Sequence, residues 1–77
     1  MKIEVFAVLK DHFDREFEVT EEVPDVASLR KHLSDINPAS SNILGICRFA
    51  INDEFVEDNH RLSAADKVII IPPSSGG

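Results

Sequence analysis

The residues best suited to chemistry lie at the end of the sequence, in the tail Pro72-Pro73-Ser74-Ser75-Gly76-Gly77. Glycine has no Cβ, so the carboxylate of Gly77 is unhindered and the backbone at Gly76 can thread a narrow channel. The two prolines form a stiff exit from a folded domain. An unhindered carboxylate on an extended arm is what an adenylating enzyme needs for attack on ATP. We therefore expect the chemistry at Gly77; a tail without a role is the alternative.

The side chains of this sequence do not form a catalytic or metal-binding set. The three histidines have spacings that match no metal motif. Ser74 and Ser75 have no nearby base or orienting acid that could activate a nucleophile. Cys47 is in phase with apolar strand positions, which predicts a buried, inert thiol. No glycine-rich phosphate loop is present, so we expect neither a metal site nor a bound cofactor, and partners must bind any ATP.

Length and charge narrow the class of protein. The 77 residues suffice for one small domain, which we expect over residues 1–72, followed by a flexible tail over 73–77. The net charge of −6 argues against nucleic-acid binding, which needs clustered Lys and Arg. No apolar run is long enough to span a membrane, and no secretory signal is evident. A single cysteine permits no internal disulfide, and we expect a cytoplasmic protein.

The first half of the sequence predicts a hairpin and a helix. Alternation of apolar and polar residues indicates a strand over residues 2–10 and a second strand over 16–21, paired with the first. Apolar residues at helical spacing indicate a helix over 26–36, with Asp25 as its N-cap. The helix should end at Asn37-Pro38, because a residue before proline disfavours helical geometry.

The second half of the sequence predicts three more strands. Residues 46–52 alternate again, a short strand begins at 55–56, and 68–71 form a continuous apolar run. Such a run is typical of a central strand covered on both faces, so we place it beside the first strand. The order of elements predicts an α+β fold, a ubiquitin-like β-grasp roll. Its mixed sheet has four to five strands, and one main helix packs on one face.

One helix cannot cover both faces of such a sheet. If Ala7 and Leu9 face the helix, alternation turns their neighbours in the first strand away from it. The apolar residues expected on the open face are Phe6, Val8, Phe55 and Ile71. A contiguous exposed apolar patch usually marks a partner surface. The alternative is that a loop, either 38–45 or 57–64, folds over the patch.

A family resemblance rests on residues spread over the whole chain: Phe6-Ala7, Asp25-Val26-Ala27-Ser28-Leu29-Arg30, Ala50-Ile51-Asn52, Leu62 with Asp66-Lys67-Val68, and Pro72-Pro73-Ser74-Ser75-Gly76-Gly77. In these segments the chain resembles the small, sulfur-carrier subunits of molybdopterin synthase, a MoaD- and ThiS-like family of ubiquitin-like proteins. Two departures are visible. Ala64-Ala65 stands where the family often has an acidic residue and glycine, and Lys10 stands where arginine is frequent, without its bidentate hydrogen bonding.

The resemblance implies a function as a substrate and subunit rather than as an enzyme. An E1-like enzyme would adenylate Gly77 with ATP, and a sulfur donor protein would convert the adenylate to a thiocarboxylate. The tail would then enter the large synthase subunit, which binds the pterin precursor and receives the sulfur, in a two-plus-two heterotetramer. The residues implied in partner binding are Phe6, Val8, Lys10, Phe55, Ile71, Pro72, Pro73, Ser74 and Ser75.

Three other functions share some of these features. Sulfur carriers for thiazole synthesis or tRNA thiolation have the same fold and Gly-Gly end. Pro72-Pro73 and Phe6-Ala7 favour the molybdopterin branch. A ubiquitin-like modifier would instead join Gly77 to target lysines, and a plain interaction module would have an inert tail.

Overall fold

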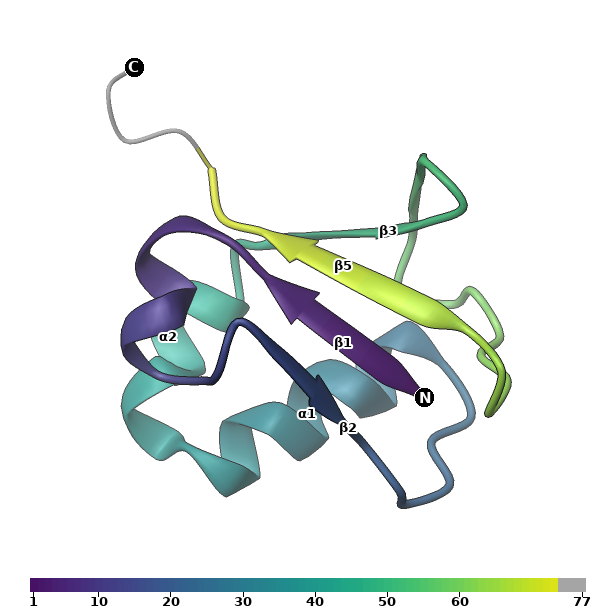
Figure 1. Cartoon of the computed structure of the whole chain (residues 1–77), viewed down its shortest axis with the longest axis horizontal. Helices are drawn as coiled ribbons and strands as arrows, with labels where there is room; N and C mark the ends of the chain where they lie inside the picture. The colour runs from purple at the N-terminus through teal and green to yellow at the C-terminus, as the bar shows by residue number, and fades with distance from the viewer. Residues whose placement is uncertain (74–77) are drawn as a thin grey trace.

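The structure, a computed structural model, describes residues 1–73 and arranges them as a sheet with helices on one of its faces (Figure 1). In chain order the elements are β1 (Lys2–Val5), the 3-10 helix η1 (Ala7–Asp11), β2 (Glu16–Glu18), α1 (Val26–Ile36), the 3-10 helix η2 (Pro38–Ser40), α2 (Ser41–Leu44), β3 (Arg48–Ile51), β4 (Glu54–Val56) and β5 (Lys67–Ile71). In Figure 1, α1 passes behind the strands, so the sheet has one covered face and one open face.

The five strands form one mixed sheet in the order β2-β1-β5-β3-β4. β1 and β5 run parallel, with Val5 opposite Ile70, and the other neighbouring strands are antiparallel. The apolar run that ends at Ile71 therefore lies in the middle of the sheet, as the sequence predicted. Val68 and Ile70 point into the core and are fully buried. The expected α+β architecture, with one main helix on one face of a mixed sheet, is confirmed.

Helix α1 has the predicted bounds because both of its ends carry local signals. At its start, the side chain of Asp25 accepts a hydrogen bond from the backbone N–H of Ser28 at 2.9 Å. Hydrogen bonds from the side chain and the backbone of Ser28 hold the pKa of the Asp25 carboxyl below its usual range. At its end, Asn37 precedes Pro38 and leaves the helical conformation. Between these ends, Leu29 and Leu33 are buried against the sheet.

The first two strands are shorter than the sequence indicated. β1 ends at Val5, and the chain then turns through Ala7, whose φ of 54° lies in the left-handed region, into η1. The predicted strand over residues 2–10 is therefore wrong beyond Val5, and β2 ends at Glu18 instead of residue 21. Leu9 still reaches the core, whereas Ala7, expected to face the helix, is exposed. A short apolar pattern fits a strand or a single helical turn equally well, so alternation alone could not locate this break.

An arginine of α1 holds the helical layer together, a role that was not predicted. The guanidinium of Arg30 donates hydrogen bonds to the backbone oxygens of Leu44 and Cys47, at the end of α2 and the approach to β3. It also pairs with Asp58 at 2.7 Å and lies over the ring of Phe49, 4.6 Å from its centroid. One side chain thus joins α1 to the end of α2 and to the approach to β3, by donating charged hydrogen bonds to two backbone carbonyls.

Replacing Arg30 with alanine should lower the free energy of unfolding by about 2 kcal/mol, because the backbone oxygens of Leu44 and Cys47 lose a charged donor and the contact with the ring of Phe49 is removed. Lys31→Ala is the matched control. Lys31 is the adjacent cation on α1 and makes only an exposed pair with Asp35, which should contribute less than about 0.5 kcal/mol. Urea denaturation followed by circular dichroism measures both variants. Equal losses in the two variants would contradict this role for Arg30.

Candidate functional site

The parallel pairing of β1 and β5 brings two distant parts of the chain to one end of the sheet. Both strands end at the same edge, so the residues after Val5 lie beside those after Ile70. Phe6 keeps the extended backbone of β1, with φ −127° and ψ 162°, and so turns its side chain to the open face. Figure 1 shows η1 and the chain leaving β5 at this same end.

Apolar side chains gather on the open face of β5, β3 and β4. Ala50 pairs in register with both Ile69 and Phe55, so these three side chains share one face. With Ile71 and Asp53 they line a shallow hollow of about 220 Å³. Phe55 is 52% exposed and Phe6 is 37% exposed. We define the apolar patch as Phe6, Ala50, Phe55, Ile69 and Ile71.

Neither of the two loops that could have covered the patch does so. Residues 38–45 form η2 and α2, which pack against α1 on the other face of the sheet. Residues 57–64 are held at the start of α1, where Ala27 donates to the oxygen of Asp58 at 3.0 Å and Val26 to that of His60 at 3.1 Å. The covered alternative is therefore wrong for the part of the chain that the structure describes.

The remainder of the open face is ionic. Lys67 lies 3.2 Å from a carboxylate oxygen of Glu4 and 3.7 Å from one of Glu16, and Lys2 lies 3.8 Å from Glu16. The hydrogen bond to Glu4 raises the pKa of Lys67. Charged side chains keep this half of the face hydrated. The apolar half, adjoining η1 and the end of β5, is the part suited to a protein partner.

The predicted site residues fall into three groups: those that are exposed, those that are at least partly buried, and those outside the described residues. Phe6, Val8 and Phe55 are exposed, Lys10 is exposed on η1, and Ile71 is half-buried in the patch. Pro72 is buried, whereas Pro73 is exposed. Ser74, Ser75, Gly76 and Gly77 lie outside the described residues. Ala50 was not anticipated; its alternation with buried Phe49 and Ile51 was the available signal.

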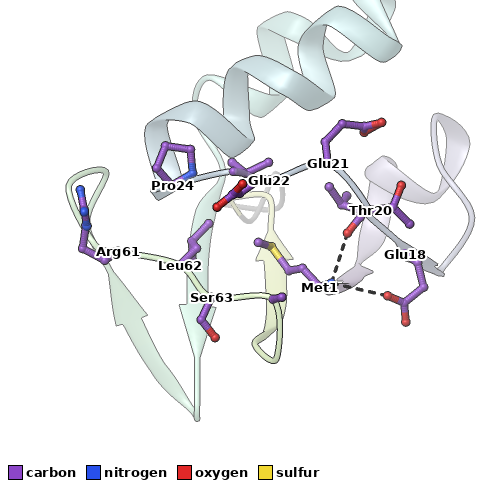
Figure 2. A pocket seen from close by; sticks show the side chains of 12 residues that line it. Met1, Glu18, Thr20, Glu21, Glu22, Pro24, Arg61, Leu62 and Ser63 are labelled. Atoms are coloured by element: carbon purple, nitrogen blue, oxygen red, sulfur yellow. Dashed lines mark hydrogen bonds and ion pairs between the residues drawn. The ribbon is translucent and has the colours of Figure 1, made fainter.

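A second, more voluminous hollow is at the opposite end of the sheet, beside the starts of β1 and β5. It has a volume of about 730 Å³ and is bordered by residues 18–24 and 61–64. Figure 2 shows Arg61 and Leu62 on one side and Glu18 on the other, with Met1 between them. The amino group of Met1 donates to the oxygen of Val19 at 3.2 Å and lies 3.6 Å from Glu18. The lining brings no nucleophile together with a histidine, cysteine or lysine that could activate it.

Residues 1–73 contain neither a cluster of metal-binding side chains nor a membrane-spanning helix. No cluster of three or more His, Cys, Asp or Glu side chains there is arranged to hold a metal ion. No helix in that range has both the length and the apolar character that crossing a membrane requires.

Cys47 is buried, as the sequence predicted. Its side chain lies in the core, and its Sγ donates to the backbone oxygen of Ile43 at 3.0 Å. Burial raises the pKa of the thiol, and the nearby charge of Arg30 only partly opposes this. A thiol with a raised pKa has little thiolate at neutral pH and is a poor nucleophile.

Comparison with known sequences gives matches over most of the chain. The sequence model of the ThiS family matches residues 3–77. The molybdopterin synthase sulfur carrier subunit of Chlamydomonas reinhardtii is 40% identical over 65 residues, which cover 78% of this chain and 78% of that protein.

Solved structures match over nearly the whole chain. SAMP1 from Haloferax volcanii superposes with a TM-score of 0.80 at 22% identity, covering 99% of this chain and 97% of that one. A likeness at this identity shows the fold, and it confirms the β-grasp arrangement. A chain in the complex of subunits 1 and 2 of the molybdopterin-converting factor from Helicobacter pylori 26695 has a TM-score of 0.71 at 26% identity. That match covers 99% of this chain and 96% of that one.

The burial of Cys47 predicts slow labelling of its thiol by a disulfide reagent in the native protein. The rate at neutral pH should be at least about tenfold lower than in urea-unfolded protein, because labelling requires both opening of the core and ionisation. Absorbance of the released thiolate measures the rate. Ser63→Cys, at an exposed position, supplies a fast-reacting control thiol. Equally fast labelling of both cysteines would contradict the burial.

Proposed function

Since the chain belongs to the ThiS family, we propose that it is the sulfur-carrier subunit of a molybdopterin synthase. The relative from Chlamydomonas reinhardtii, which carries that name, supports this branch of the family. The observation that carries the proposal is the position of the apolar patch. It lies where β5 ends, next to the segment that leads to Gly77. A partner that binds the patch is thereby placed beside the tail.

The chemistry that we propose takes place at the carboxylate of Gly77. An E1-like enzyme adenylates this carboxylate with ATP and releases pyrophosphate. Sulfur delivered by a donor protein at the oxidation level of sulfide then displaces AMP and leaves a thiocarboxylate. Within the large subunit of molybdopterin synthase, the thiocarboxylate gives its sulfur to a pterin precursor, and water restores the carboxylate. ATP and the pterin are substrates held by the partners.

The chain's own residues would position the tail and supply no acid or base. The hollow beside the end of β5 is lined by apolar side chains and Asp53, and Arg48 pairs in register with Ile71. None of these forms a pair of nucleophile and base. The absence of Cβ atoms at Gly76 and Gly77 lets the arm enter a narrow active site. The catalytic side chains in this proposal belong to the activating enzyme and the large subunit.

The large subunit is the partner that we assign to the apolar patch. Phe6, Phe55 and Ile71 present a shallow hydrophobic surface of the kind that forms the centre of a protein interface. Val8 and Lys10 are exposed on η1, the 3-10 helix that directly follows Phe6. The Helicobacter pylori structure, described as a complex of subunits 1 and 2 of the molybdopterin-converting factor, supports a partner of this kind. The same patch could also guide the activating enzyme, because both partners must reach the same tail.

Mass spectrometry of the protein isolated from cells should find a fraction in which one oxygen at Gly77 is replaced by sulfur. A variant that lacks Gly77 should show no such species and no activity with the large subunit. Branched Gly-Gly–Lys peptides in other proteins would instead indicate a ubiquitin-like modifier. Full activity of the truncated variant would refute any role of the tail.

The pathway is tested separately by gene deletion and rescue. Deletion should abolish molybdenum-dependent growth on nitrate, and restoring the chain should recover it. A strain that still grows on nitrate but requires thiamin, or that lacks thiolated tRNA, would assign the same tail chemistry to another pathway.

Phe6→Arg should preserve the fold but weaken binding to the large subunit by about tenfold or more, because it places an unpaired charge in a hydrophobic interface. Ile36→Arg is the matched control, since Ile36 is an apolar residue on α1 that is 58% exposed and far from the patch. Isothermal titration calorimetry with the purified large subunit measures both variants. Unchanged binding of the Phe6 variant would show that the patch is not the interface.

A further inference from the structure

One cation lies at the apolar patch. Arg48 is the first residue of β3, and alternation with buried Phe49 turns its side chain to the open face. It pairs in register with Ile71, the last residue of β5. Its guanidinium stacks on the ring of Phe55, with Cζ 3.8 Å from the ring centroid. A cation over an aromatic face is attracted by the negative charge of that face.

Within residues 1–73, Arg48 has no carboxylate within ion-pair distance and no hydrogen bond from its guanidinium. The lysines of the same face differ in this respect, since Lys2 and Lys67 both pair with glutamates. The one acidic residue that lines the hollow, Asp53, forms no ion pair with Arg48. Among the described residues, Arg48 therefore has an aromatic face as its partner but no carboxylate.

A protein that covers the patch must also cover this charge. Arg48 lies on Phe55, so a surface that contacts the ring removes water from the guanidinium as well. Removing water from an unpaired guanidinium is unfavourable enough to offset much of the gain from apolar contact. Only an acceptor on the partner can restore the balance, and a carboxylate matches the planar donor pair of arginine best.

We infer that the surface of the large subunit that covers the apolar patch presents an aspartate or glutamate to Arg48, and that this pair sets the register of the two proteins. The inference rests on the proposed function, because it takes the large subunit as the partner. Apolar contacts around Phe55 allow small sliding movements. A bidentate hydrogen bond to a guanidinium that is already stacked on a ring does not allow such movements. Fixing the register also fixes where the segment after Ile71 enters the partner.

Substitution of Arg48 tests whether the partner supplies a carboxylate to this residue or only covers its charge. With a carboxylate opposite, Arg48→Leu should weaken binding of the purified large subunit by about tenfold or more, because the partner's charge is then buried alone. Arg48→Lys should lose less affinity than Arg48→Leu, since lysine keeps the positive charge but lacks the planar pair of N–H donors of the guanidinium. Without a carboxylate, Arg48→Leu would enlarge the apolar surface and bind as tightly as the unsubstituted chain or more tightly, which would overturn the inference.

Lys31→Leu is the control for net charge. It removes one positive charge from the opposite face, where Lys31 pairs only with Asp35, and it should bind like the unsubstituted chain. Circular dichroism must show the same thermal midpoint for the Arg48 variants. Salt gives an independent measure: raising the ionic strength should weaken binding of the unsubstituted chain more than that of Arg48→Leu. Equal salt dependence of the two would count against the pair.

The outcomes for the two proposals are distinguishable. If the large subunit binds the chain, and Phe6→Arg disrupts binding while Arg48→Leu does not, only the register pair is overturned. If the unsubstituted chain does not bind the large subunit, the proposed function fails and the inference fails with it. If Arg48→Leu weakens binding, Arg48→Glu with lysine substitutions of the partner's surface carboxylates identifies the residue. The correct combination should recover most of the lost affinity.

Discussion

The parallel pairing of β1 with β5 is the constraint on which the rest of the molecule depends. It places two segments far apart in sequence side by side in the centre of the sheet, with Ile3 opposite Val68 and Val5 opposite Ile70. Because the strands run in the same direction, the chain leaves both at one edge. Phe6 and the segment after Ile71 must therefore be neighbours. This pairing places Phe6 of the apolar patch and the point where the chain leaves β5 at the same end of the sheet.

A single helical layer on this sheet accounts for the division of its two faces. α1, held to α2 and β3 through Arg30, covers one face and completes the core. The other face has no cover among residues 1–73 and is divided into an ionic half around Lys67 and an apolar half around Phe55. Only the apolar half adjoins the end of β5. The charged half of the open face is suited to contact with water, whereas the apolar half is suited to contact with a protein.

The success of the sequence predictions followed the strength of the local signals. α1 was predicted to the residue because Asp25 caps its start and Pro38 follows its end. The continuous apolar run at the end of the described chain identified the central strand. The first strand was predicted too long, since the apolar residues from Phe6 to Leu9 fit alternation in a strand as well as the 3-10 helix η1, which buries Leu9 and leaves Ala7 exposed. Only the left-handed backbone at Ala7 decides between them.

By itself, the sequence determined the family, the order of the elements and the apolar residues available for a core, and it predicted the chemistry at the Gly-Gly end, because these depend on residue type and on neighbours along the chain. The tertiary structure alone decided which apolar residues meet on the open face, and that the loops do not cover them. It alone placed Arg30 against two backbone oxygens and Arg48 on the ring of Phe55. Those contacts join residues from different elements, and no local pattern encodes the register that brings them together.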